Sequence, residues 1–251
     1  MNDSLIQFKK KFYFFKLTDT WFQFVHTYKN IFSLRSYSFV QNDQYIKNTF
    51  CIKTTSATIE VSLENDEEYI TANFRKKTAQ DIRKAKDLGI ECLFNKDLNT
   101  FIEFYNDFAR QKNIYPVNKK SFETFTNNYV TCFAVLNGEI LAAHLQLFDT
   151  ENSIARGYLG GNRRFDPVFD SRTIGMANKL LKSQELFYFK SLGIKKYDFG
   201  GYAENTDDKG LQGINEYKLS FGGVVVKNIN YQSLSYFILR KLSELLDRRY
   251  K

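Results

Sequence analysis

Two ionisable side chains occupy positions where general acid–base chemistry is feasible. Asp198 lies near the end of the predicted strand 195–199 and is followed by two glycines. Because open α/β sheets bind ligands at strand ends, Asp198 is a candidate to accept a proton or to orient an amine; the alternative is a turn residue that accepts hydrogen bonds from the glycine backbone. His144 lies in the apolar segment 140–148. Histidine titrates near neutral pH, so His144 is a second candidate base, with a half-buried structural histidine as the alternative.

Charged side chains near these candidates suggest contacts with a substrate. Glu204 follows the two glycines on a polar stretch. It is a candidate for binding a substrate or for replacing Asp198 as the base; the alternative is a solvated loop without such a role. The segment 67–88 is rich in basic side chains: Arg75, Lys76, Lys77, Arg83, Lys84 and Lys86. They form either a solvated helix face or a grip on the diphosphate of a nucleotide-linked or lipid-linked sugar.

The N-terminal segment 5–16 mixes aromatic rings with lysines. The lysines interrupt any apolar run and no small-residue cleavage site follows, so this is not a secretion signal. Two interpretations stay open: an aromatic strand with a solvated edge, or an interfacial anchor for acidic lipid.

The composition limits the classes of protein and of partner. The chain has 251 residues, and 36 Lys+Arg against 28 Asp+Glu give a net charge of +8, which favours anionic partners such as nucleotide phosphates, RNA or an acidic membrane face. Three scattered cysteines and two histidines argue against a disulfide scaffold or a metal site and favour a cytoplasmic location, with peripheral contact at the inner face of the membrane as a further expectation. No apolar run is long enough to span a membrane.

Hydrophobic periodicity and turn residues predict the order of the elements. The predicted helices are 21–29, 67–88, one capped by Asp97, 119–129, one capped by Ser171 and running to 190, 211–220 and 234–250. The predicted strands are 5–16, 32–39, 45–53, 57–61, 90–94, 131–136, 140–148, 153–159, 195–199 and 224–231. The fold class is therefore mixed α/β, a largely antiparallel sheet with helices on both faces.

From about residue 90 to 231 this order resembles the GNAT acyltransferase fold. Three motifs sharpen the resemblance toward the FemAB-like branch of that superfamily: Ile82-Arg-Lys-Ala in the basic helix, Asp198-Phe-Gly-Gly201, and Gly213-Ile followed by Tyr217-Lys and Phe221-Gly-Gly223. The resemblance implies a reduced, strand-rich N-terminal subdomain at 1–70 and a complete acyltransferase domain with a C-terminal helix at 71–251.

The resemblance also implies site residues. The segment Arg172-Thr173-Ile-Gly175-Met-Ala177 is similar to the GNAT signature that binds the pyrophosphate of the acyl donor at a helix N-terminus; an ordinary helix start with Gly175 packed on the sheet is the alternative.

Three further candidates follow from the motifs. Tyr217 resembles the GNAT tyrosine that protonates the departing sulfur, although it could equally pack against the sheet. Lys218 corresponds to the FemAB lysine and would hold a phosphate or the polarised carbonyl, or else be solvated. Arg83 is the candidate substrate contact in the basic helix.

The function implied is an acyl-CoA-dependent N-acyltransferase, with acetyl-CoA or another acyl-CoA as donor, no metal, and an amino sugar of a surface-polysaccharide or cell-envelope precursor as acceptor. One alternative is a FemAB-type transfer from aminoacyl-tRNA to a peptidoglycan precursor. Another is a non-catalytic GNAT-like module that binds RNA or an acidic membrane. The acyl-CoA and the aminoacyl-tRNA hypotheses both require the strands that end near residues 161 and 201 to separate and admit the acyl arm of the donor.

Overall fold

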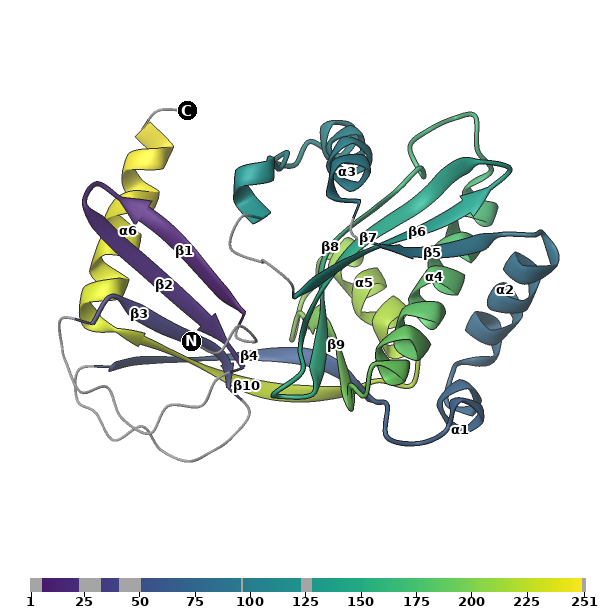
Figure 1. Ribbon diagram of the computed structural model, residues 1–251, viewed down its shortest axis with the longest axis horizontal. Coiled ribbons are helices and arrows are strands. Elements are labelled where there is room, and N and C mark those ends of the chain that lie inside the picture. Colours follow the sequence, from purple (N-terminus) through teal and green to yellow (C-terminus); the bar gives the residue numbers. More distant parts are fainter. Residues whose placement is uncertain (1–5, 23–32, 41–50, 96, 123–127, 250–251) are drawn as a thin grey trace. The chain divides into compact units, whose positions relative to one another are not determined.

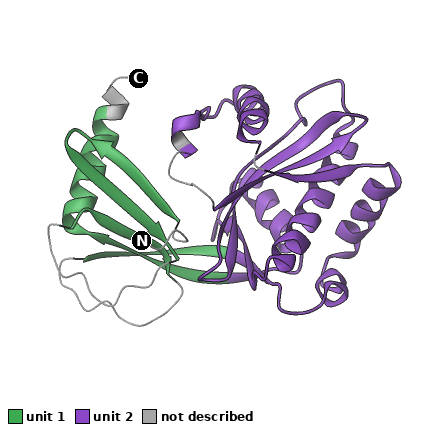
Figure 2. Cartoon of the chain, in the orientation of Figure 1, with its two compact units in different colours: residues 1–58, 226–251 green, residues 59–225 purple. Residues whose placement is uncertain are grey.

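The computed structural model describes residues 6–22, 33–40, 51–95, 97–122 and 128–249. The chain forms two compact units, residues 1–58 with 226–251 and residues 59–225 (Figure 2). Strands β4 (Cys51–Ser62) and β10 (Val224–Ser233) each run from one unit into the other. The C-terminal helix α6 (Leu234–Arg249) thus belongs to the unit that contains the N-terminal strands, because β10 pairs with β3 just before it.

The unit of residues 1–58 and 226–251 is a small sheet with one helix. Strands β1 (Gln7–Phe12) and β2 (Phe15–Trp21) form an antiparallel hairpin, β2 runs parallel to β3 (Arg35–Val40), and β10 pairs antiparallel with β3. The predicted N-terminal strand is therefore a hairpin. The helix predicted at 21–29 is wrong at its start, since Trp21 ends β2, and the rest lies outside the described residues; so does most of the strand predicted at 45–53.

The unit of residues 59–225 carries the larger sheet, drawn from blue to green in Figure 1. Its strands, in spatial order beside the end of β4, are β9 (Lys196–Gly201), β8 (Ile154–Asn162), β7 (Glu139–Asp149), β6 (Tyr129–Leu136) and β5 (Glu91–Asn95). Its helices are α1 (Glu67–Ala72), α2 (Lys76–Asp87), α3 (Leu98–Lys112), the short 3-10 helix η1 (Lys119–Phe122), α4 (Ser171–Ser191) and α5 (Lys209–Leu219).

Helices cover both faces of this sheet. Helix α3 packs on β7 and β8 from one side, whereas α4 packs on β5 to β8 from the other and is itself covered by α2 (Figure 1). All neighbouring strand pairs from β5 to β8 are antiparallel, and β8 and β9 are parallel. The predicted mixed α/β class, largely antiparallel and with helices on both faces, is confirmed.

Three local predictions are wrong. The single helix predicted at 67–88 is two helices, because the chain breaks between them and places Phe74 in the core, 5.3 Å from the ring of Phe221. Of the helix predicted at 119–129, residues 119–122 form the 3-10 helix η1 and Tyr129 begins β6, which makes the predicted C-terminal end wrong; residues 123–127 lie outside the described residues. The cap of α4 is Asp170 rather than Ser171: the Asp170 carboxylate accepts hydrogen bonds from the backbone N–H and the hydroxyl of Thr173.

A stability prediction follows from the turn between α5 and β10. Gly222 has a φ of +77°, and a Cβ there would lie 2.7 Å from Asn73 Cβ and 2.9 Å from Asn73 O. Strain and the clash together should make Gly222→Ala lower the free energy of unfolding by about 2–4 kcal/mol in chemical denaturation. The matched control is Gly213→Ala within α5, where a Cβ meets nothing within 4 Å; it should leave stability unchanged or raise it by up to about 1 kcal/mol. Equal stability of both variants would contradict this close packing.

Candidate functional site

Strands β8 and β9 separate after a short paired stretch. Their parallel register covers Ile154 opposite Lys196, Ala155 opposite Tyr197 and Arg156 opposite Asp198, although β8 continues to Asn162 and β9 to Gly201. A cavity of about 670 Å³ lies along the unpaired part of β8. The separation that acyl transfer requires is therefore present.

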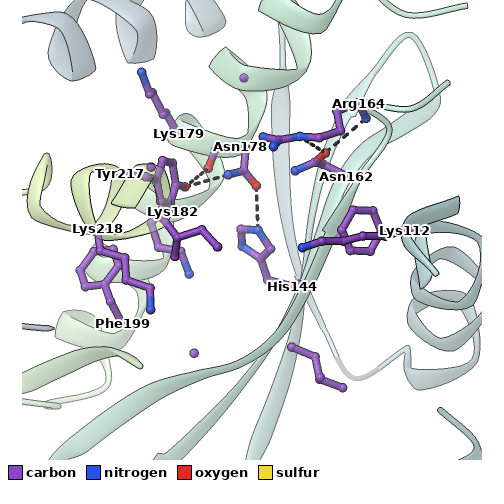
Figure 3. A pocket seen from close by; sticks show the side chains of 18 of the residues that line it. Lys112, His144, Asn162, Arg164, Asn178, Lys179, Lys182, Phe199, Tyr217 and Lys218 are labelled. Atoms are coloured by element: carbon purple, nitrogen blue, oxygen red, sulfur yellow. Dashed lines mark hydrogen bonds between the residues drawn. The ribbon is translucent and has the colours of Figure 1, made fainter. Parts of the chain in front are cut away.

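The cavity draws its lining from both faces of the sheet. Residues of β7, β8, β9, α3, α4 and α5 contribute, and Figure 3 shows His144 between Lys112 on one side and Lys182 and Lys218 on the other. The charged lining residues are all cations: Lys112, Arg164, Lys179, Lys182, Lys209 and Lys218. No acidic side chain is among the residues that line it.

Two of the six cations are neutralised by nearby acids. Lys179 lies 2.8 Å from Asp81, and Lys182 lies 2.5 Å from Glu185. Within the described ranges, the other four have no carboxylate within ion-pair distance. Uncompensated cations along a partly enclosed wall attract anionic ligands.

His144 is held at both ring nitrogens. Its Nδ1 lies 2.5 Å from Glu185 Oε1 and its Nε2 lies 2.9 Å from Asn178 Oδ1, so a ring with a proton on each nitrogen satisfies both acceptors. The ring also needs a glycine beside it, because a Cβ at Gly160 would stand 2.8 Å from His144 Cδ2. His144 is thus fixed in place with an edge on the cavity, and it is buried to 6% exposure.

Glu185 has 0% exposure and is the centre of a buried polar cluster. Its second oxygen contacts Lys182 and accepts a hydrogen bond from the Tyr197 hydroxyl at 3.1 Å, and Lys182 donates to that hydroxyl at 2.7 Å. Burial opposes ionisation, but the charges and hydrogen bonds of Lys182 and His144 outweigh it and lower the pKa of Glu185 to about 2. The cluster therefore contains a permanent carboxylate.

Tyr217 extends this network to α5. Its hydroxyl accepts a hydrogen bond from Asn178 Nδ2 at 2.8 Å, and Asn178 in turn contacts His144 (Figure 3). Burial, and then the charge of Glu185, raise the pKa of Tyr217 well above its usual value. Tyr217 lines the cavity as a neutral phenol, so it can donate a proton but does not carry charge at neutral pH.

Lys218, the next residue, also lines the cavity, and its Nζ donates to the carbonyl of Gly201 at 2.6 Å. Burial lowers the pKa of Lys218 to about 8; Asp198 opposes this, whereas Arg156 and Lys182 add to it. A lysine of this kind exists in both protonation states near neutral pH, which suits proton exchange with a substrate.

Asp198 does not reach the cavity. It is completely buried, forms an ion pair with Arg156 and accepts a hydrogen bond from the backbone N–H of Gly200 at 2.7 Å. Burial raises the pKa of Asp198 despite the opposing charge of Arg156. The structure places it in the turn-forming arrangement that its neighbouring glycines suggested.

The start of α4 brings only part of the suggested pyrophosphate segment to the cavity. Gly175 lines it, but Arg172 is exposed outside it, Thr173 binds the Asp170 cap and Ala177 is buried in the core. The two residues expected to bind the substrate lie elsewhere. Arg83 is exposed on α2, Glu204 is exposed in the loop before α5, and neither lines the cavity.

Several polar residues of the site were not singled out from the sequence, among them Asn178, Lys182 and Glu185 on α4 and Gln146 on β7. Gln146 stands two residues from His144, so strand alternation alone puts both on one face. The α4 residues are spaced four and three apart and so share one helix face. These spacings are a usable signal, although they do not reveal that the shared face is buried.

The described part of the chain contains no group of three or more His, Cys, Asp or Glu side chains able to hold a metal ion. Among its helices, none is both long and apolar enough to cross a bilayer.

The buried cluster generates a prediction about acid stability. Because Glu185 has a folded pKa below its unfolded value of 4.5, its stabilisation is complete above about pH 4.5 and is lost as the pH falls toward about 2. Glu185→Gln should flatten this part of the stability curve and cost about 3–5 kcal/mol at pH 7, since Lys182 stays buried without its partner. Lys182→Met combined with Glu185→Leu should recover part of that loss. A steeper acid slope in Glu185→Gln would contradict the assignment.

Lys218 should react as a neutral amine at lower pH than exposed lysines do. Competitive acetylation with acetic anhydride between pH 6 and 11, quantified peptide by peptide, should give a midpoint near 8 for Lys218. The same depressed pKa means that its destabilising effect is largest below pH 8 and fades as the pH rises toward 10.5. In Lys218→Arg, the acetylation signal with a midpoint near pH 8 should be absent. A midpoint near 10.5 would contradict the crowding of cations at this site.

Comparisons with known proteins agree with the fold. No protein-family model matches the chain, and no curated protein sequence does. The solved structure of FemX is similar with a TM-score of 0.69 at 12% identity, covering 93% of this chain and 85% of that one. L-PGS from Bacillus licheniformis has a TM-score of 0.55 at 10% identity, and the match covers 86% of this chain and 74% of that one. The C-terminal domain of a putative lysylphosphatidylglycerol synthetase from Agrobacterium fabrum has a TM-score of 0.54 at 9% identity, with 84% of this chain and 71% of that one covered. The chain therefore has a FemX-like fold, and the resemblance to the FemAB-like branch is confirmed at that level.

Proposed function

We propose that the chain is an acyltransferase whose donor carries phosphate and enters between β8 and β9. The observation that carries this proposal is the separation of these strands around a cavity lined by six cations and no acid. An extended acyl arm fits such a gap, and the cations suit the phosphates of the molecule that delivers it.

Aminoacyl-tRNA is the donor that the site supports best. A donor whose pyrophosphate lies on the α4 N-terminus needs free amides there, but the Asp170 carboxylate already accepts from Thr173 N and brings a negative charge to the same place. Arg172, the expected partner of a pyrophosphate, lies off the cavity. The resemblance to FemAB-type proteins implies an aminoacyl-tRNA donor, and the name of another similar protein, a putative lysylphosphatidylglycerol synthetase, describes a product bearing a lysyl group.

The chemistry assigned to the site is attack of an acceptor amine on the acyl carbon of the donor ester. A nitrogen–carbon bond forms, and the carbon–oxygen bond breaks with its electron pair leaving on the ribose oxygen. Neutral Lys218 accepts the proton that the amine gives up, and Tyr217 donates one to the leaving oxygen. One proton then returns from Lys218 to Tyr217 and resets the site.

His144 and Glu185 act here as positioning residues. Glu185 fixes the His144 ring, His144 fixes the Asn178 amide, and Asn178 orients the Tyr217 hydroxyl. The acceptor is an amine of a cell-envelope precursor, either a peptidoglycan precursor or an amino sugar of a surface polysaccharide.

Acyl-CoA is the second candidate donor, for acetyl or another acyl transfer to an amino sugar. It is favoured by Tyr217, which lines the cavity as a protonated phenol able to protonate a thiolate, and by Gly175 at the cavity end of α4. Asp170 would then have to leave the helix N-terminus to make room for the diphosphate.

Binding measurements distinguish the two donors. Fluorescence anisotropy with labelled aminoacyl-tRNA should show salt-sensitive binding, and calorimetry with millimolar acetyl-CoA should show little. Lys112→Gln combined with Lys209→Gln should weaken tRNA binding about tenfold, because both lysines are exposed and each exposed ion pair contributes up to about 1 kcal/mol. The matched control is Lys84→Gln with Lys86→Gln, two exposed lysines of α2 outside the cavity. Saturable acetyl-CoA binding without tRNA binding would favour the second donor, and binding of neither would overturn the acyltransferase proposal.

A further inference from the structure

The hairpin of β1 and β2 ends in two exposed aromatic rings. Tyr13 is 71% exposed and Phe14 is 84% exposed, and the flanking Phe12 and Phe15 complete an aromatic tip of four consecutive rings. Phe14 and Phe15 lie with centroids 4.2 Å apart, and Phe12 and Tyr13 lie 5.0 Å apart. Water therefore surrounds Tyr13 and Phe14, whereas Phe12 and Phe15 at the base of the tip are half-buried.

The turn at the tip is also conformationally costly. Tyr13 has a φ of 51°, in the left-handed region that glycine and asparagine occupy at lower cost than a bulky aromatic residue. The Tyr13 ring packs edge-on against Phe12 but is still 71% exposed, so a costly backbone conformation holds an aromatic ring mostly in water, which points to a role for the ring outside the chain.

Three lysines lie together behind this tip. Lys11 is directly opposite Lys16, and Lys9 is opposite Thr18, so Lys9, Lys11 and Lys16 share one side of the hairpin, defined here as the lysine face. All three are exposed, and within the described residues none forms an ion pair with a carboxylate. Two like charges directly across a strand pair repel, and binding of an external anion would relieve this repulsion.

The opposite side of the hairpin is covered by its own unit. Lys10 belongs to that side, and its Nζ donates to the hydroxyl of Ser243 on α6 at 3.2 Å. Leu17, directly opposite Lys10, is 2% exposed. The lysine face and the aromatic tip are thus the outward parts of the hairpin.

The arrangement of rings and charges matches the depth profile of a lipid bilayer. The exposed rings lie at the extreme end of the hairpin, and the lysines follow two to four residues behind them, as phosphates lie outside the acyl chains in a membrane surface. Phe12 and Phe15, a directly opposed pair, lie on the side away from Lys11 and Lys16. A surface that stacks RNA bases would instead place its rings among its cations.

We infer that the β1–β2 hairpin docks on anionic phospholipid bilayers, with Tyr13 and Phe14 entering the interface and the lysine face contacting the headgroup phosphates. This attachment does not depend on the acyltransferase proposal, since it uses the other compact unit and no cavity residue.

Co-sedimentation with vesicles tests the docking. The full chain should bind vesicles of equal parts phosphatidylglycerol and phosphatidylcholine and should bind pure phosphatidylcholine much more weakly. Tyr13→Ser with Phe14→Ser should reduce binding at least tenfold. Lys11→Gln with Lys16→Gln should reduce vesicle binding about 25-fold at low salt, because each lysine contributes about fivefold. The thermal stability of this variant should stay the same or rise, because a repulsive pair is removed.

Matched controls separate docking from general charge attraction. Lys84→Gln with Lys86→Gln on α2 makes the same charge change and should bind like the wild type, as should Tyr69→Ser, which removes an exposed ring of α1. If these controls lose as much binding as the hairpin variants, or if the tip variant binds as the wild type does, the inference is overturned. Hairpin variants that lose tRNA binding while retaining vesicle binding would also overturn it, in favour of a nucleic-acid surface.

Fluorescence then tests penetration. Trp21 ends β2, roughly 20 Å along the strand from the tip at about 3.3 Å per residue. Lipids brominated in their acyl chains should quench Phe14→Trp strongly, and they should leave Trp21 of the wild type almost unquenched. Equal quenching in both proteins, or none in Phe14→Trp, would contradict insertion of the tip.

Discussion

A carboxylate without any exposure to solvent holds the candidate site together. An ionised Glu185 in the interior is tolerated only if its charge and its lone pairs are satisfied, and Lys182, His144 and Tyr197 do this. These partners come from α4, β7 and β9, so the three elements must keep their relative positions or leave a buried charge unpaired. The contacts continue from His144 through Asn178 to α5, which is how a structural ion pair sets the position of groups that face the cavity.

A second buried ion pair stands where β8 and β9 part. Arg156 and Asp198 are the last residues of the two strands in register, and the strands diverge immediately beyond them. Buried pairs add little net stability, but they strongly penalise structures in which one partner is displaced. The position of Arg156 and Asp198 at the point of divergence therefore specifies where β8 and β9 separate. Asp198 also accepts from Gly200, so the same carboxylate directs the turn that brings the Gly201 carbonyl to Lys218.

The sequence predicts periodic elements better than it predicts buried charge. From β5 onward, strands and helices carry clear periodicity and turn residues, and the observed order follows them. The break at Asn73 and Phe74 has no proline or glycine to announce it; it arises because Phe74 packs on Phe221, a contact between distant parts of the chain. Asp170 and Ser171 are both good helix caps, and only the fold decides between them.

In the candidate site too, some residues could be predicted from the sequence and others could not. Tyr217, Lys218, His144 and Gly175 were identified from motifs or strand position, and they meet at one cavity. Glu185 stands in a segment of lysine, serine and glutamine that resembles a solvated helix face, and its burial depends on β7 and β9. Asp198, by contrast, lies at a strand end, as a catalytic carboxylate could, but in a position that solvent does not reach. Local chemistry identifies candidates, but accessibility belongs to the tertiary structure.

The lowered pKa of Lys218 indicates what the cavity lacks. Burial is the largest cause of this lowering; Arg156 and Lys182 also disfavour the protonated form of Lys218, whereas Asp198 favours it. A protein that concentrates cations in this way raises the free energy of its own unliganded state, and an anion placed among them removes that cost. Crowding of like charges is therefore a more specific argument for a phosphate-bearing ligand than the net charge of +8, which would be the same if the lysines were spread evenly over the surface.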